Sequence, residues 1–267
     1  MMSKTNQPTL QGISSNKTKL RISAIFIIIV GFYLFTSIKT ESSLLDLWNG
    51  KNGFINIAQS LFPPHWSYAS TVMPQLIETL HMAIIATTVA ALISIPISLL
   101  SAANLFPNPF IHQPVRFIMN VLRTIPDILL ALIFVGIFGV GVFPGIMALI
   151  IFSLGLLAKL LYETIESIDM NPIEAIRASG GNTLQVITYA VMPQVLPQFV
   201  SFGLYVFEVN VRASLVLGFV GAGGIGLLLN QQVSWANYPN VMTIIIIIFI
   251  SVVIIDYISN KIRERLI

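Results

Sequence analysis

Ionisable side chains interrupt two otherwise apolar segments of this sequence of 267 residues. Arg123 and Asp127 lie in one segment, and Glu208 and Arg212 lie in the other, with Asn210 between them. Arginine presents several donors in one plane, which suits the oxygens of phosphate-like groups. The chemistry that this pattern favours is non-covalent contact with an anion, with Arg123 and Arg212 as the candidate contacts.

The spacing of Glu208 and Arg212 puts both side chains on one face of a helix, where they neutralise one another. Such a pair either holds helices together or belongs to a pathway, and the sequence leaves both readings open. Asn210 points elsewhere and is expected to bond a neighbouring helix.

A glycine-rich run follows, with Gly221, Gly223, Gly224 and Gly226. Its spacing matches a dinucleotide fingerprint, but no βαβ pattern surrounds it and no acidic residue follows about twenty positions later. Glycines in this pattern allow a sharp turn or the close approach of another helix. We therefore predict a turn at the outer end of a span, where it would serve as an outer gate.

The sequence offers no support for catalysis, metal binding or nucleotide hydrolysis by this chain. His65, His81 and His112 lack the spacing of zinc ligands, and there is no cysteine. A phosphate-binding Gly-x-x-x-x-Gly-Lys-[Ser/Thr] loop is also missing. We expect no catalytic residue, no metal and no bound cofactor.

Composition puts these residues in a bilayer, because the chain is 55% hydrophobic and only 9% charged, against about 25% charged in soluble domains. Its basic residues gather at membrane ends, which argues against nucleic-acid binding. Six windows are long enough to cross hydrocarbon; they lie near 22–38, 76–100, 116–138, 145–165, 195–217 and 240–258. Charges inside them should face inward, which makes Arg123, Asp127, Glu208, Asn210 and Arg212 the translocation-path candidates.

Basic residues before the first span and after the last predict that both termini are cytosolic. The expected organisation is a polar cytoplasmic head, a first anchor, an extracytoplasmic loop, a membrane core and a basic cytoplasmic tail, over 1–21, 22–38, 39–75, 76–258 and 259–267. Counted at about 1.5 Å per residue, Arg123 lies near the cytosolic start of its span and Arg212 toward the outer mouth.

A polar helix and turn, over Asn171–Gly181, separates two of the spans. Asn171 is expected to cap the helix, with Pro172 at its first position and Glu174 three residues after the cap. Gly180 and Gly181 then stop it.

A second short helix is predicted from about Thr183 to Met192, where Pro193 ends it. The cytosolic loop over 167–193 resembles the EAA loop of ABC-importer permeases, which in that family is the socket for an ATPase subunit. Four residues match the family pattern with its spacing, namely Glu174, Ala175, Gly180 and Pro193, whereas Ile176, Ala190 and Met192 depart from it. The resemblance implies ATPase coupling through Glu174, Ala175, Gly180, Gly181 and Pro193.

The Glu208-x-Asn210-x-Arg212 stretch and the glycine run look like the phosphonate-type branch of these permeases. Arg123-Thr-Ile-Pro126-Asp127 and Glu78-Thr79-Leu80 resemble the same branch, and the resemblance covers about 74–258. It implies an all-α integral membrane protein with about six transmembrane helices and the MetI-like architecture of type I importers. The implied solute is a phosphonate or a related anion such as phosphite or phosphate.

The resemblance also implies partners and a location. Two copies of an ABC ATPase subunit would use ATP, and an extracytoplasmic phosphonate-binding protein would deliver the solute. The permease would be a multi-pass homodimer among the lipids of a bacterial cytoplasmic membrane.

Two other classes of function fit parts of the sequence. An ion-coupled secondary transporter would use Asp127, Glu208 and Arg212 as coupling groups, and a membrane enzyme would use buried glutamates and histidines. Neither the secondary transporter nor the membrane enzyme explains the polar loop around Glu174.

Overall fold

The computed structural model describes residues 16–40 and 44–266, and every regular element in those ranges is helical, as the sequence predicted. The chain divides into two compact units, residues 1–59 and 60–267. The first unit contains α1 (Asn16–Thr40) and most of α2 (Leu44–Ser60). Within α1, the 22 residues Lys19–Thr40 are long and apolar enough to cross a membrane.

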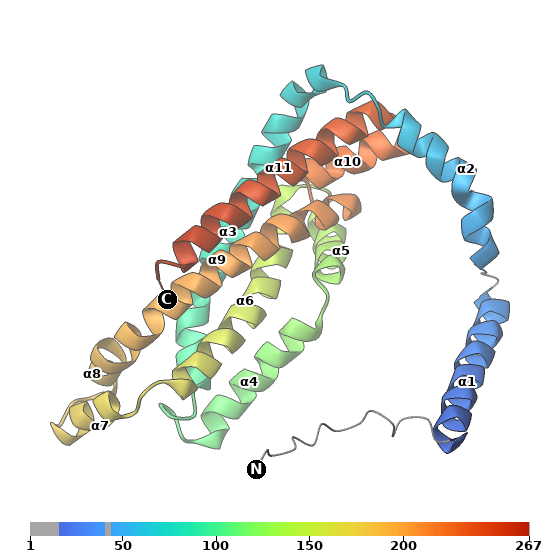
Figure 1. Cartoon of the computed structure of the whole chain (residues 1–267). Coiled ribbons are helices and arrows are strands. Elements are labelled where there is room, and N and C mark those ends of the chain that lie inside the picture. The colour runs from blue at the N-terminus through green and yellow to red at the C-terminus, as the bar shows by residue number, and fades with distance from the viewer. Residues whose placement is uncertain (1–15, 41–43, 267) are drawn as a thin grey trace, which may run out of the picture. The chain divides into compact units, whose positions relative to one another are not determined.

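The second unit is a bundle of long helices with short ones at its ends (Figure 1). In chain order it contains η1 (Trp66–Tyr68), α3 (Ala69–Ser101), α4 (Pro109–Thr124), α5 (Asp127–Phe138), α6 (Val142–Ser167), α7 (Asn171–Ala178), α8 (Thr183–Val186), a π segment η2 (Ile187–Val191), α9 (Met192–Leu217), η3 (Gly218–Val220), α10 (Gly224–Ser234) and α11 (Tyr238–Arg263).

Five helical stretches among the described residues are long and apolar enough to span a membrane, and a sixth results if α4 and α5 count as one. Those two helices, which cover the predicted third span near 116–138, are bent by 85° at their junction. Pro126 lacks an N–H and forces the residue before it out of the helical region, and Ile125 is extended at φ −79° and ψ 120°.

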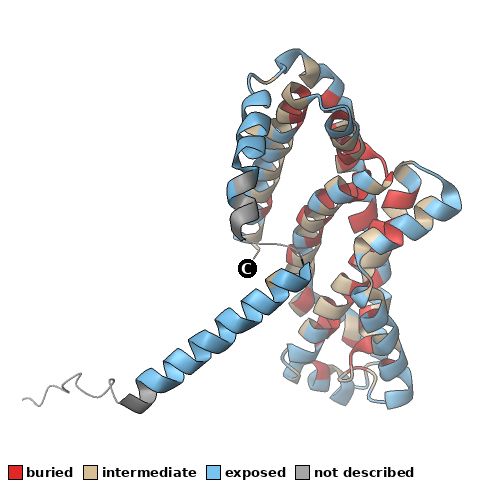
Figure 2. Ribbon diagram, turned by 90° about the vertical axis from the view of Figure 1, so that its right-hand side faces the viewer, coloured by how far each residue is buried: buried red, intermediate tan, exposed pale blue. Residues whose placement is uncertain are grey.

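The helix α6 is the centre of the bundle, since it contacts α3, α4, α5 and α9. Small residues make this close packing possible, with Ala86, Ala90, Ala148 and Ala158 fully buried. Figure 2 shows the buried positions gathered between these helices, with exposed positions along their outer faces. Most of those outer side chains are apolar, as a lipid-facing surface requires.

Candidate functional site

The helix α7 begins differently from the sequence expectation. Its cap residue is Met170, so Asn171 is not the cap but the first helical residue, followed by Pro172. The carboxylate of Asp169 accepts a hydrogen bond from the Asn171 N–H at 3.0 Å and thereby takes the capping role. Glu174 makes no capping bond and is exposed.

The second half of the loop is a continuation of α9. The α8 helix begins with a capping box in which Asn182 and Gln185 exchange hydrogen bonds of 2.8 and 2.9 Å. Pro193 does not end this helix, because it stands in the first turn of α9, directly after the π segment. A π segment widens the turn, which accommodates the missing N–H of Pro193.

Buried contacts fix α7 and α8 to the rest of the bundle. Ile173 and Val186 are fully buried, and both pack in one cluster with Ala102 and Ile165. Gln194 ties the start of α9 to Asp169, accepting from its N–H at 3.1 Å and donating to its carbonyl oxygen at 3.3 Å. Any movement of α7 is therefore passed to α6 and α9.

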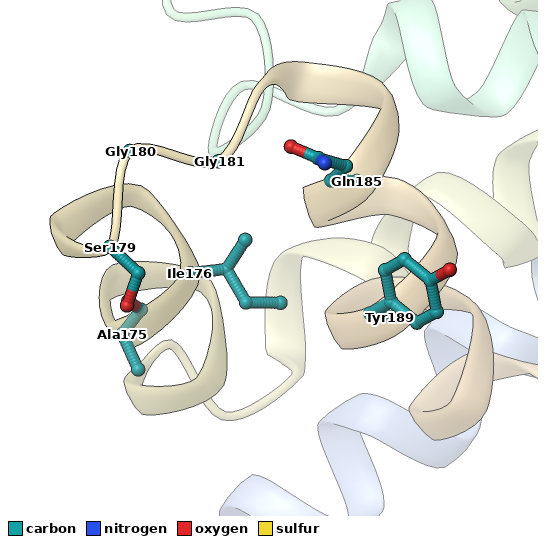
Figure 3. Close-up of a pocket in the computed structure, with 7 residues that line it drawn as sticks. All are labelled: Ala175, Ile176, Ser179, Gly180, Gly181, Gln185 and Tyr189. Carbon is teal, nitrogen blue, oxygen red and sulfur yellow. The ribbon is translucent and has the colours of Figure 1, made fainter.

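The outward side of α7 and α8 is an open hollow of about 460 Å³, shown in Figure 3. Its lining consists of Ala175, Ile176, Ser179, Gly180, Gly181, Gln185 and Tyr189. Tyr189 is 71% exposed, and the Glu174 side chain has no hydrogen bond or ion pair among the residues that the structure describes. An exposed hollow of mixed polar and apolar lining, with an unpaired carboxylate on the same helix, is suited to receiving another protein.

The turn after α9 combines three left-handed glycines. Gly221, Gly223 and Gly224 have φ of 89°, 79° and 69°, which only glycine adopts readily. The predicted turn is therefore present, while its role as an outer gate stays a prediction. All of residues 221–226 are buried.

Two side chains from α3 hold the start of α10 in this turn. The Glu78 carboxylate accepts a hydrogen bond from the Gly224 N–H at 2.8 Å, and the Thr79 hydroxyl accepts one from the Ile225 N–H at 2.9 Å. They satisfy the free N–H groups at the start of that helix. The sequence analysis singled out Glu78 and Thr79 only as part of a resemblance.

Asn210 is fully buried and joins three helices. Its amide nitrogen donates to the Thr87 hydroxyl on α3 at 2.8 Å, and its amide oxygen accepts from the Ser153 hydroxyl on α6 at 2.9 Å. The predicted bond to a neighbouring helix is therefore present. Because Asn210 exposes no surface in this conformation, it lines no path here.

Glu208 is 5% exposed and has a closer partner than the one the sequence suggested. Arg263, at the end of α11, donates to its carboxylate at 2.6 Å, whereas Arg212 lies 3.6 Å away. Arg212 also lies 3.9 Å from Asp256 of α11. Sequence reasoning treated Asp256 as a boundary charge and placed Arg263 in the basic tail, because no local spacing links α11 to α9.

The packing places the Arg123 backbone beside α6 at Gly155. A Cβ on Gly155 would lie 3.2 Å from the Arg123 backbone nitrogen, and Ser153, two residues from Gly155, bonds Asn210. The expectation that the two cations lie near opposite ends stays a prediction.

Arg123 is the last-turn residue of α4, exposed and without a hydrogen bond or ion pair among the described residues. It stands beside the bend, and Asp127 follows at the start of α5, where its carboxylate accepts from the Ile128 N–H at 2.9 Å. An unpaired guanidinium is costly in hydrocarbon, so this side of the bend should face water, a polar ligand or protein.

Metal chemistry finds no support among the described residues, which contain no group of three or more histidines and carboxylates able to hold an ion. The features that could contact other molecules are the charged side chains of α4, α5 and α9 and the hollow beside α7 and α8.

Comparison with known proteins matches residues 94–266 to the family described as binding-protein-dependent transport system inner membrane component. The phosphite transport system permease protein PtxC of Stutzerimonas stutzeri is 38% identical over 226 residues, covering 83% of this chain and 82% of that protein. The phosphate-import permease protein PhnE of Mycolicibacterium smegmatis is 35% identical over 220 residues, covering 82% of this chain but 41% of its own length.

Solved structures agree on the fold. The permease chain of an inward-facing MetNI methionine ABC transporter superposes with a TM-score of 0.63 over 73% of this chain and 96% of its own length, at 24% identity. An amino acid ABC transporter crystallised with histidines gives a TM-score of 0.62 at 21% identity. At such identities the likeness concerns architecture alone.

Proposed function

The chain belongs to the family of binding-protein-dependent transport system inner membrane components, and from that premise we propose that it carries a phosphorus oxyanion into the cell. It is the permease subunit of an ABC importer. The proposed solute is a phosphonate, with phosphite and phosphate as the alternatives. The observation that carries the proposal is the 38% identity to a phosphite transport permease over most of both chains.

Two exposed arginines of the bundle support the proposal that the solute is an anion. Arg123 is exposed and unpaired among the described residues, and the Arg212 side chain is 51% exposed. Guanidinium groups bind phosphate-like oxygens through several parallel hydrogen bonds. We assign Arg123 and Arg212 to the translocation path, with Asp127 and Glu208 fixing the local charge.

Energy for transport comes from a separate ATPase subunit docked at α7 and α8. Glu174, Ala175, Gly180, Gly181 and Pro193 form or shape this socket, and the exposed, unpartnered carboxylate of Glu174 suits a basic group on the ATPase. The buried contacts of Ile173 and Gln194 transmit the movement of the socket to the membrane helices.

The proposed assembly is a homodimer of this chain with two ATPase copies. An extracytoplasmic binding protein delivers the solute near the Gly221–Gly226 turn, which acts as the outer gate. Both termini are cytosolic in this arrangement, and residues 39–75 lie outside. The absence of cysteine from the sequence makes orientation testable with single cysteines and impermeant thiol reagents.

Uptake by proteoliposomes tests the solute assignment. The chain is reconstituted with its ATPase and binding protein, and ATP-driven accumulation of methylphosphonate, phosphite and phosphate is compared with that of methionine. We expect accumulation of at least one phosphorus oxyanion and none of methionine. Accumulation of methionine alone would refute the solute class, and uptake that needs a proton gradient but no ATP would favour the secondary transporter.

A further inference from the structure

The polar cluster between α9 and α11 has two halves that differ in burial and contact. Glu208 and Arg263 form the inner half, with side chains 6% and 24% exposed and an ion pair of 2.6 Å. Arg212 and Asp256 form the outer half, with side chains 51% and 37% exposed and a separation of 3.9 Å. The charges of the two carboxylates and the two guanidiniums therefore sum to zero. The inner pair is closer together and more buried than the outer pair.

Arg263 is well placed to act as the fixed counter-ion of Glu208. Besides Glu208 it bonds only the side chain of Asn260, at 2.8 Å, and its Nε is buried without a partner among the described residues. A buried carboxylate must be paired, because an isolated charge in a low-dielectric site is strongly unfavourable. Without Arg263, the nearest replacement partner is Arg212, one helical turn along α9.

We propose that Arg263 is a positioning residue that neutralises Glu208 and thereby leaves Arg212 available to the transported anion. This inference rests on the proposed function, since it assumes that the solute is negatively charged. Removing the charge of Arg263 would draw Arg212 onto Glu208 and would leave the cluster with a net negative charge. Both changes oppose the passage of an anion.

The lack of cysteine allows the local potential to be measured without knowing the solute. Val216 lies one turn beyond Arg212 on the same face of α9 and is 50% exposed, so Val216→Cys provides a reporter thiol. The full-length permease, assembled with its ATPase in nanodiscs, is labelled with an anionic and a cationic methanethiosulfonate reagent of similar size. The ratio of the two rates reports the sign of the nearby charge.

We expect Arg263→Gln to lower the ratio of anionic to cationic labelling by about fivefold, the effect of one unit charge at this range. Glu208→Gln combined with Arg263→Gln should return the ratio to its starting value, because the net charge is again zero. Arg263→Lys should keep the ratio, and Arg265→Gln serves as the matched control, since Arg265 is exposed and unpaired among the described residues.

A ratio that does not fall in Arg263→Gln, or that stays low in the double variant, would overturn the inference. A role limited to holding α9 against α11 predicts that Arg263→Gln lowers the unfolding temperature while the ratio of labelling rates stays unchanged. Uptake of phosphite by the same variants should follow the labelling ratio. If the unaltered importer takes up no phosphorus oxyanion, the proposed solute fails, while the labelling ratio still decides the role of Arg263.

Discussion

Two glycine-rich turns, at opposite ends of α9, use glycine for different reasons. At Gly180 the backbone has φ of 82°, yet an added Cβ would meet nothing within 4 Å. At Gly226 a Cβ would run into the carbonyl oxygen of Leu215 and would lie 3.0 Å from the Cα of Gly218. Gly180 therefore needs only a backbone conformation, whereas Gly226 needs space. Gly181, beside Gly180, also needs space, because its Cβ would lie 2.8 Å from the Ile176 carbonyl oxygen.

This difference between Gly180 and Gly226 agrees with the function proposed for each turn. The turn at Gly180 and Gly181 is largely exposed and borders a hollow that another protein could fill. The turn at Gly221–Gly226 is buried, and Glu78 and Thr79 of α3 accept hydrogen bonds from it, which holds the start of α10 against α3. The two turns therefore differ in exposure, since one borders an open hollow and the other is buried and closely packed.

The largest loss of stability is expected from Gly226→Ala. The added methyl overlaps the Leu215 carbonyl, and overpacking of this kind costs about 3 kcal/mol or more when backbone must move. The measurement is the unfolding temperature in detergent. Gly203→Ala in α9, with nothing within 4 Å of the new Cβ, is the control and should be neutral or slightly stabilising. Equal effects at the two positions would contradict the close packing.

Glu78→Ala is expected to have the next largest effect. It leaves the buried Gly224 N–H without its acceptor, which costs about 1–3 kcal/mol. Chemical denaturation of the purified permease measures the change. Glu163→Ala is the matched control, because Glu163 is 51% exposed and pairs only with Lys159; such surface pairs contribute about 0–1 kcal/mol. A larger loss for Glu163→Ala would mean that Glu78 does not hold the turn.

Gly180→Ala should cost about 1–2 kcal/mol, because alanine is strained in the left-handed conformation even where space is free. Gly180→Asn should recover part of this loss, since asparagine tolerates that conformation better. Thermal unfolding of both variants, compared with Gly226→Ala, separates conformational strain from overlap. If asparagine is worse than alanine, space rather than conformation limits the socket turn.

The smallest change in stability, within about 0.5 kcal/mol, is expected from Glu174→Arg, because this exposed side chain has no partner among the described residues. Assembly should nevertheless be lost, since reversed charge at a docking surface disfavours the partner. Co-purification with the ATPase is the measurement, and Glu264→Arg on the exposed C-terminal tail is the control. Retained assembly with Glu174→Arg would contradict the docking assignment.

Local patterns in the sequence predicted the parts of the fold that depend on local physics. The apolar windows predicted long membrane helices, and the polar segment around Glu174 predicted two short helices joined at glycines. The third span was predicted as one window near 116–138, and the 85° bend beside Pro126 was not predicted. The cap of α7 was also misplaced by one position, since Met170 and not Asn171 is the cap residue, while the Asp169 carboxylate accepts from the Asn171 N–H.

The partners of the charged residues depend on packing between distant segments. The pair of Glu208 and Arg212 was predicted correctly because helical periodicity brings residues four apart together. The closer pair of Glu208 and Arg263 joins residues 55 positions apart and has no local signature. The same holds for Glu78 and Gly224.

The sequence by itself determined that this chain is a helical membrane protein with a polar cytosolic-type loop, because hydropathy and helix signals act over a few turns. Only the tertiary structure decided which charges are buried, which are available, and which glycines have no room for a side chain. Those properties depend on the register of α9 against α3, α6 and α11, which is fixed by packing contacts spread over the whole bundle.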